Sequence, residues 1–185
     1  MLSMNVFRLV VVGSLVAATL APACSQAQGA QAANQQRLQA RLQKEVRHVL
    51  VTQPFYSVFD NLAYKVDGDR VTLLGQVVQP TLKSDAAAAV KSIEGVSAVD
   101  NEIEVLPVSP SDDRIRRAEF RAIYSAPGME KYSIQAVPPI HIIVKNGHAT
   151  LVGVVASEAD KILANARAQS VPGVFSVTNQ LTVEK

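Results

Sequence analysis

The residues best suited to binding chemistry are basic side chains on two predicted helices, over residues 38–50 and 112–124. At about 100° per residue, the cations of the first helix cluster opposite its apolar face, and those of the second fall within about 60°. Guanidinium groups match phosphate oxygens, and each basic residue near an anionic membrane contributes ~1 kcal/mol. The candidates for binding lipid headgroups are Arg41, Lys44 and Arg47 in the first helix and Arg114, Arg117, Arg121 and Tyr124 in the second. The alternative is that both are ordinary solvated helix faces.

Groups suited to catalysis or metal binding are sparse. His141 and His148 flank a predicted hairpin but have no nearby carboxylate or thiol, and His48 stands alone on the first helix. The sequence contains neither a G-x-S-x-G elbow nor a glycine-rich phosphate loop. We therefore expect no catalytic residue, no metal, no cofactor and no small-molecule substrate, and we predict that the protein is not an enzyme.

Residues 1–23 have the layout of a secretory signal peptide, with Arg8, an apolar run over 9–20 and small residues before the cut. The run is too short to cross a bilayer of about 30 Å as a helix. Two hypotheses for the cut remain open. Cleavage at an A-x-A site gives a free periplasmic protein, whereas lipidation of Cys24 anchors the chain to the outer membrane. Ala21 departs from the usual lipoprotein box, but the single cysteine falls at the predicted cut, which favours lipidation.

Composition limits the function of the rest of the chain. Hydrophobic residues make up 48% and charged residues 18%, so most of the chain is expected to fold. A formal net charge of +2 gives no indication of nucleic-acid binding. Residues 24–36 are rich in Gln and Ala, which predicts a flexible tether. The alternative for this segment is an extension of the first helix, because both residues favour helix.

An internal repeat determines the expected architecture. A shift of 78 residues superimposes 71–105 on 149–183 without a gap, with 13 of 35 positions identical. The matches include turn glycines and an asparagine, a pattern that composition alone does not produce. Each copy contains a hairpin signal, a returning strand, an alanine-containing helix and an alternating final strand. The chain is therefore predicted to be a duplication.

The predicted fold class is α+β, with two tandem α-β-β-α-β modules, each a small three-stranded mixed sheet packed against two helices. We place the first module at residues 37–106, a linker at 107–111 and the second module at 112–185. A unit of about 70 residues is marginal by itself, so packing between the two copies is plausible.

The segment Gly-Val-x-x-Val-x-Asn-x-(Ile/Leu)-x-Val occurs at 95–105 and again at 173–183, each after a Thr-Leu-x-Gly strand. This pattern resembles the BON domain, in two copies that cover nearly all of the chain from about Leu38. The plan is similar to dual-BON outer-membrane lipoproteins and to periplasmic osmotically inducible proteins. The resemblance implies a non-catalytic module that associates with anionic phospholipid surfaces and supports envelope integrity or osmotic stress tolerance. The alternative is a periplasmic protein-interaction or chaperone-like adaptor that uses exposed sheet edges.

Overall fold

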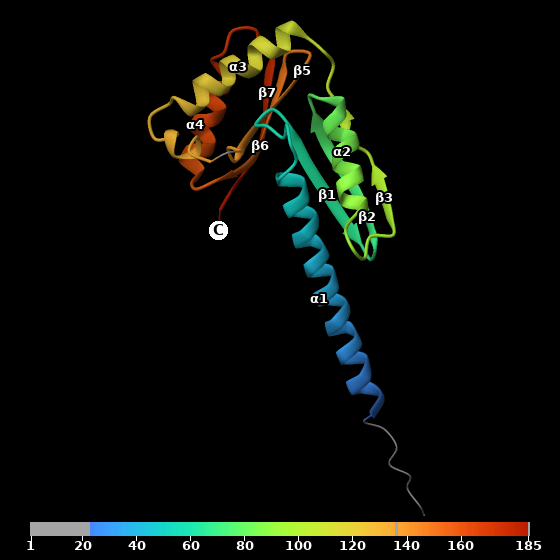
Figure 1. Ribbon diagram of the computed structural model, residues 1–185. Helices are drawn as coiled ribbons and strands as arrows, with labels where there is room; N and C mark the ends of the chain where they lie inside the picture. The colour runs from blue at the N-terminus through green and yellow to red at the C-terminus, as the bar shows by residue number, and fades with distance from the viewer. Residues whose placement is uncertain (1–22, 136, 185) are drawn as a thin grey trace, which may run out of the picture. The chain divides into compact units, whose positions relative to one another are not determined.

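The computed structural model describes residues 23–135 and 137–184, with side chains from residue 34 onward. The predicted signal peptide lies outside the described residues except for Ala23, as does the side chain of Cys24. Figure 1 shows the described chain as two modules that each place helices against a small sheet.

The first module begins with a long helix and continues as a hairpin, a second helix and a returning strand in two pieces. β1 pairs antiparallel with β2, and β2 pairs parallel with both β3 and β4, so the sheet is mixed. The elements are α1 (Ala23–Val51), β1 (Asn61–Asp67), β2 (Arg70–Val77), α2 (Pro80–Lys91), β3 (Ala98–Asn101) and β4 (Glu104–Val105).

The second module repeats this order and adds one turn of 3-10 helix at Glu130–Tyr132. β6 pairs antiparallel with β5 and parallel with β7, which again gives a mixed sheet. The remaining elements are α3 (Pro110–Tyr124), β5 (Ile140–Lys145), β6 (His148–Val155), α4 (Glu158–Gln169) and β7 (Ser176–Val183). The predicted α+β class with two α-β-β-α-β modules is confirmed.

The repeat found in the sequence extends to hydrogen bonds that join helix and strand. The Asn101 side chain donates to the carbonyl oxygen of Lys83 in α2 at 2.8 Å and accepts from the backbone N–H of Ile103 at 3.2 Å. Its counterpart Asn179 donates to Lys161 in α4 at 3.0 Å and accepts from Leu181 at 3.1 Å. The recurring asparagine therefore fastens each final strand to the preceding helix, because both ends of its amide are used.

The matched strand glycines mark places where two strands come too close for a side chain. A Cβ on Gly75 would lie 2.0 Å from the carbonyl oxygen of Asn61, and one on Gly153 would lie 1.9 Å from that of Pro139. Both residues also have positive φ, +109° and +138°. Glycine is required here by space as well as by backbone conformation.

Each module has its own apolar cluster. In the first, α1, β2 and α2 contribute most of the residues, namely Leu42, Val46, Leu50, Val71, Leu73, Val77, Leu82, Ala86 and Val90. In the second, Ile115 and Ile123 of α3 pack with Ile140, Ile142 and Leu151 of the sheet. Branched aliphatic residues make up most of both cores, and the second core also contains Tyr124, Met129 and Tyr132.

Residues 24–36, which the sequence predicts as a flexible tether, differ from that prediction. Their backbone is helical and belongs to α1, which starts at Ala23. High intrinsic helix propensity of Ala and Gln explains the difference, since such residues extend an existing helix at little cost. The backbone of this segment matches the alternative interpretation, an extension of the first helix.

Candidate functional site

α3 carries the basic side chains that the sequence singles out in the second module. Ser109 caps the helix by accepting from the backbone N–H of Asp112 at 3.2 Å, and Pro110 occupies the first turn, where it costs no hydrogen bond. Ile115 and Ile123 face the core. The cap and this apolar stripe fix which side of α3 faces solvent.

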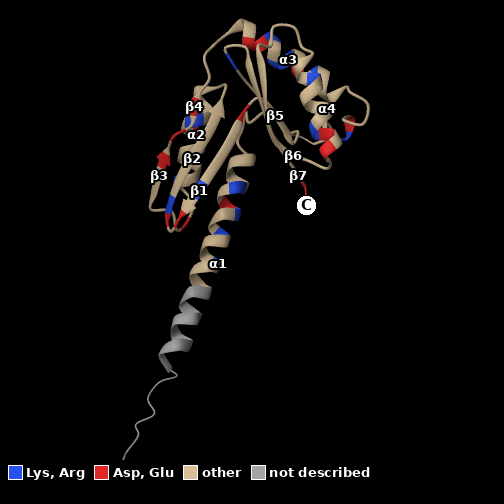
Figure 2. Ribbon diagram, turned by 180° about the vertical axis from the view of Figure 1, so that it is seen from behind, with Lys and Arg blue, Asp and Glu red and all other residues tan. Residues whose placement is uncertain are grey.

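Three arginines lie on the solvent side of α3. Arg114, Arg117 and Arg121 are exposed, and in the described part of the chain none has a carboxylate within 4.0 Å. Spacings of three and four residues put them on one face of the helix. In Figure 2, the ribbon of α3 is blue at the positions of its basic residues. The expected arginine face therefore exists, with its charges available to an anion.

Tyr124, which the sequence predicts as part of the lipid-binding site, is instead buried. It is only 5% exposed and belongs to the apolar cluster, and its hydroxyl donates to the carbonyl oxygen of Ile140 at 2.6 Å. Burial raises the pKa of Tyr124 far above its ordinary value. The ring lies beside the arginines in sequence but on the core side of the helix, so it cannot contact a membrane surface in this fold.

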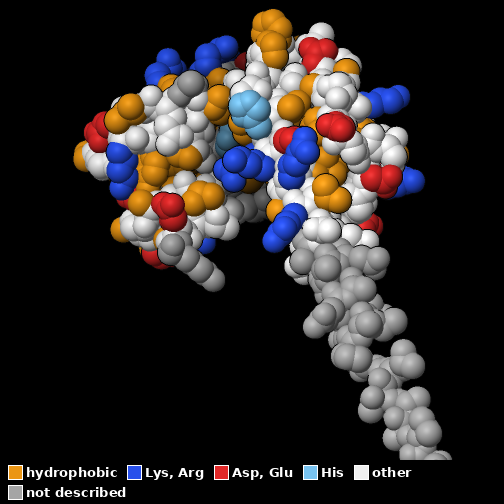
Figure 3. Space-filling view, turned by 60° about the horizontal axis from the view of Figure 1, so that its bottom comes forward, with side chains coloured by type: hydrophobic (Ala, Val, Ile, Leu, Met, Phe, Trp, Pro, Cys, Tyr) orange, Lys and Arg blue, Asp and Glu red, His pale blue; other side chains and the backbone are white. Residues whose placement is uncertain are grey.

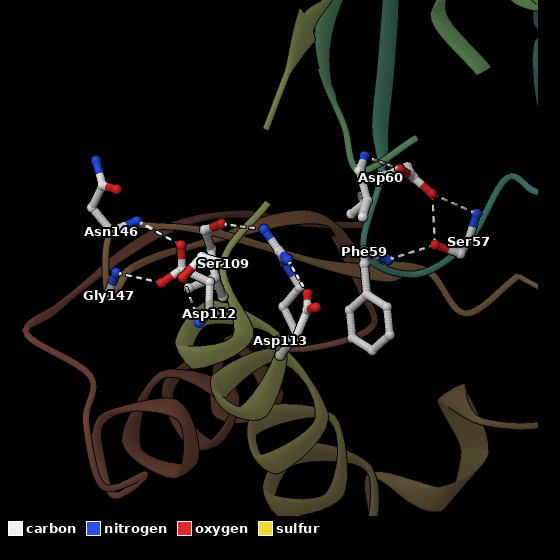
Figure 4. A network of polar contacts seen from close by, with 11 residues as sticks. Ser57, Phe59, Asp60, Ser109, Asp112, Asp113, Asn146 and Gly147 are labelled. Carbon is white, nitrogen blue, oxygen red and sulfur yellow. Dashed lines mark hydrogen bonds and ion pairs between the residues drawn. The ribbon is translucent and has the colours of Figure 1, made fainter. Parts of the chain in front are cut away.

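Asp112 ties the start of α3 to the β5–β6 turn, as Figure 4 shows. Its carboxylate accepts from the backbone N–H groups of Asn146 and Gly147, both at 2.9 Å, and the side chain is almost fully buried. Asn146 has φ of +52° and Gly147 of +76°, the left-handed pair of a two-residue hairpin turn. The acidic side chain thus orients the helix that carries the arginine face.

Two further charged residues of α3 lie in the interior. Arg116 donates to the carbonyl oxygen of Val144 at 2.6 Å and to Asp113 at 2.5 Å, while its Nε has no partner among the described residues. Both carboxyl oxygens of Glu119 also lack a described partner. Glu119 is fully buried, and the loss of hydration raises its pKa to about 7. Burial therefore favours the neutral carboxyl of Glu119 in the folded chain.

The basic residues of α1 are less uniformly available than those of α3. Arg41 pairs with Glu45 at 2.8 Å and with Glu94 at 3.7 Å, so neighbouring carboxylates offset its charge. Lys44 and Arg47 are exposed, with no carboxylate within 4.0 Å in the described chain. Of the three α1 candidates, two remain free cations.

A groove on the first module escaped the sequence analysis. It has a volume of about 500 Å³ and lies between α1 and the residues that follow α2, lined by Arg41, Lys44, Glu45, His48, Val49, Ser92 and Ile93. Figure 3 shows basic and hydrophobic side chains together beside the described part of α1. Only the fold brings residues 44–49 next to 92–93, so no local pattern indicates this groove.

The loop after α1 divides its aromatic residues between solvent and interior. Phe55 is 66% exposed and has φ of +70°, an uncommon conformation for a bulky residue. Tyr56 is half-buried and stacks on His141 with ring centroids 5.5 Å apart. Burial raises the pKa of Tyr56 to about 12 and lowers that of His141.

The described residues contain neither a candidate metal site nor a candidate membrane-spanning helix. Over residues 23–135 and 137–184, no group of three or more His, Cys, Asp or Glu side chains is arranged to hold a metal ion. Within the same ranges, no helix combines the length and the apolar character needed to cross a membrane.

Solved structures with distant similarity to this chain include two of CdsD. The C-terminal domain of CdsD, the structural protein of the type III secretion system of Chlamydia trachomatis, is 14% identical with a TM-score of 0.31, over 77% of this chain and 96% of that chain. A second CdsD structure is also 14% identical, with a TM-score of 0.30, over 78% of this chain and 92% of that chain.

A search of the curated proteins finds no match. The family model of the BON domain matches in two places, residues 32–107 and 129–185. The first match includes part of α1, whereas the second begins after α3. The two matches together cover well over half of the sequence and coincide with the two copies of the repeat. The chain therefore belongs to the BON domain family, with two BON domains in tandem.

Proposed function

We propose that this protein is an exported envelope protein whose second BON domain binds anionic phospholipid surfaces through the arginine face of α3. The observation that carries the proposal is the exposed row of Arg114, Arg117 and Arg121, without a carboxylate partner in the described chain. The BON domain is known as a phospholipid-binding domain, which supports a membrane partner. In this proposal the protein has no catalytic step.

Electrostatics explains how such a face would bind. Each guanidinium presents a planar fork that fits two phosphate oxygens, and each basic residue near an anionic surface contributes ~1 kcal/mol. Three arginines give about 3 kcal/mol, which is a reversible peripheral attachment. Lys44 and Arg47 of α1 add two exposed cations in the first domain. Because the interaction is largely Coulombic, it should weaken as salt shortens the Debye length to about 8 Å at physiological ionic strength.

Export places the domains on the side of the membrane where this attachment acts. We propose that residues 1–23 direct the chain to the periplasm and that Cys24 becomes its lipidated first residue. Labelling with radioactive palmitate tests this step. The label is expected on the native chain and absent from Cys24→Ser, whereas an unlabelled native chain would favour the A-x-A cut.

A role in envelope integrity or osmotic stress tolerance follows if attachment matters in the cell. A strain that lacks the gene is expected to be more sensitive to detergents and to osmotic downshift. Restoration by the native gene but not by a variant with Glu at 114, 117 and 121 would link that sensitivity to the arginine face. Equal restoration by both genes would separate the cellular role from lipid binding.

The second candidate function is a protein-interaction adaptor. The observation that favours it is β7, an eight-residue strand that pairs with β6 alone among the described strands, so its outer edge has free backbone groups. Such an edge can accept an extended segment of another protein by β-augmentation. This pairing depends on backbone hydrogen bonds and is insensitive to salt, which distinguishes it from headgroup attraction.

Vesicle co-sedimentation separates the two functions. The full chain is mixed with vesicles of phosphatidylcholine alone or with added phosphatidylglycerol, at about 50 mM and about 500 mM salt, on either side of the screening range. We expect binding only to the anionic vesicles and a marked loss at high salt. Salt-independent binding to both vesicle types, or no difference between them, would contradict the electrostatic proposal.

A further inference from the structure

The groove of the first domain joins a basic rim to an apolar floor. Lys44 and His48 come from successive turns of α1, and Val49 and Ile93 form part of the floor. Both apolar residues are half-buried and pack against the first core. A ligand that fits this arrangement has an anionic group beside a hydrocarbon segment.

The charges around the rim would attract an anion to one end of the groove. Glu45 is the acidic residue of the lining, and its carboxylate is engaged by Arg41 at 2.8 Å. Lys44 has no such partner in the described chain, and the His48 ring makes no described hydrogen bond, so each has N–H donors available. An anion would therefore be attracted to Lys44 and His48.

The second domain provides an internal comparison, because its corresponding region is filled. A Cβ on Gly173, after α4, would meet the side chain of Ile115 at 3.7 Å, whereas one on the matching Gly95 would meet nothing within 4 Å. Val171 is 6% exposed and buried, whereas its counterpart Ile93 is half-buried. In the second domain, α3 therefore covers the turn that follows α4. In the first domain the same place stays open.

We propose that this groove is a second anionic-lipid site, separate from the arginine face of α3. The phosphate of one phospholipid lies between Lys44 and His48, and the first part of an acyl chain lies on Val49 and Ile93. The volume of about 500 Å³ is within the range of roughly 300–1,000 Å³ that small-molecule sites occupy. Binding to the arginine face depends only on the negative charge of a surface, whereas binding in this groove needs a ligand with both an anionic group and a hydrocarbon segment.

Titration with a monomeric lipid tests the groove. The full chain is titrated with lysophosphatidylglycerol below its micelle concentration, and binding is followed by calorimetry and by amide chemical shifts. We expect saturable binding, with the largest shifts at residues 44–49 and 92–95. Lys44→Glu is expected to weaken binding about tenfold or more, and so is Ser92→Phe, which adds a ring at an exposed position in the lining.

Two control variants keep the test specific. Lys65→Glu makes the same charge change on an exposed residue of β1 outside the groove, and it should leave the affinity within about twofold. In the triple variant with Glu at 114, 117 and 121, lysophosphatidylglycerol should still shift the amides of residues 44–49 and 92–95, even if the variant no longer binds vesicles. Failure of the arginine face and failure of the groove are thereby distinguishable.

Several results would overturn the groove proposal. Equal weakening by Lys44→Glu and Lys65→Glu would mean that the attraction is diffuse. Binding unaffected by Ser92→Phe, or lost in the α3 triple variant, would place the lipid elsewhere. If inorganic phosphate bound the groove as tightly as lysophosphatidylglycerol does, the apolar floor would play no part in binding. The urea unfolding midpoint of each variant verifies that the variant is folded.

Discussion

The carboxylate of Asp112, at the start of α3, accepts a 2.9 Å hydrogen bond from the backbone N–H of Gly147 in the β5–β6 turn. A second hydrogen bond, from Asn146, uses its other oxygen. Asp112→Asn keeps the shape but replaces one acceptor with an NH₂ group that faces a backbone donor. We expect a loss of about 1–3 kcal/mol in the free energy of unfolding, measured with urea.

The matching turn of the first domain supplies the control for Asp112. Asp69 lies in that turn and is exposed, and its carboxylate makes no described hydrogen bond. Asp69→Asn is therefore expected to change the free energy of unfolding by less than about 0.5 kcal/mol. Equal effects of the two substitutions would show that Asp112 does not fasten the helix to the turn.

Glu119 predicts a pH-dependent stability. Its folded-state pKa of about 7 lies above the ordinary value near 4.3, so the folded protein binds this proton more tightly than the unfolded chain. Its unfavourable contribution is absent below pH 4, grows between about 4.3 and 7, and is complete above pH 7. Removing the charge should help only at the higher pH. Glu119→Gln is thus expected to raise the free energy of unfolding by about 2–3 kcal/mol at pH 8 and to change it little at pH 4.

The measurement for Glu119 is urea unfolding of the native chain and the variant at both pH values. Glu184→Gln, at an exposed carboxylate, is the matched control and should show no such pH dependence. A Glu119→Gln effect that is the same at pH 4 and pH 8 would mean that the carboxyl is neutral or paired throughout.

The paired asparagines predict equal effects in the two domains. Asn101→Ala and Asn179→Ala each remove a donor to the helix and an acceptor for a strand N–H. Each is expected to cost about 1–3 kcal/mol, seen as a lower unfolding midpoint. Asn→Asp at either position keeps the acceptor but places a carboxylate oxygen against the helix carbonyl, so it should not restore the lost stability. A neutral alanine variant in either domain would contradict the structural role.

Close approach at Gly153 predicts a larger effect than backbone conformation alone. Gly153→Ala would put a Cβ 1.9 Å from the carbonyl oxygen of Pro139, so the β5–β6 pair must move apart. We expect a loss above about 3 kcal/mol. Gly95→Ala, at φ of +96° with open space around it, should cost only about 1–2 kcal/mol. Thermal unfolding of the two variants, compared at the same pH, measures the difference. Similar losses would show that the contact with Pro139 is relieved easily.

The repeat made most of the fold predictable. Its shift of 78 residues carries β2 onto β6 and α2 onto α4 with the same bounds, because turn signals and apolar periodicity recur at the same places. The sequence leaves residues 24–36 open between a tether and a helix, since low apolar content does not distinguish a solvated helix from a flexible chain.

The candidate site was predictable only where a helical wheel determines it. Arg114, Arg117 and Arg121 share an exposed face as expected. Tyr124 lies on the core side, because its hydroxyl finds an acceptor in Ile140, a contact between positions 16 apart. The groove beside Lys44 is formed by α1 and by the residues that follow α2, and local sequence does not indicate that these two segments meet.

The most direct test of the proposed function compares two triple charge reversals on anionic vesicles. One variant carries Glu at 114, 117 and 121, and the control carries Glu at the exposed positions 65, 91 and 167, so both change the net charge by the same amount. At low salt, the α3 variant is expected to lose at least about 100-fold in affinity for phosphatidylglycerol vesicles, from ~1 kcal/mol for each arginine. The control should lose much less. Equal losses in both variants, or none in the α3 variant, would contradict binding through the arginine face.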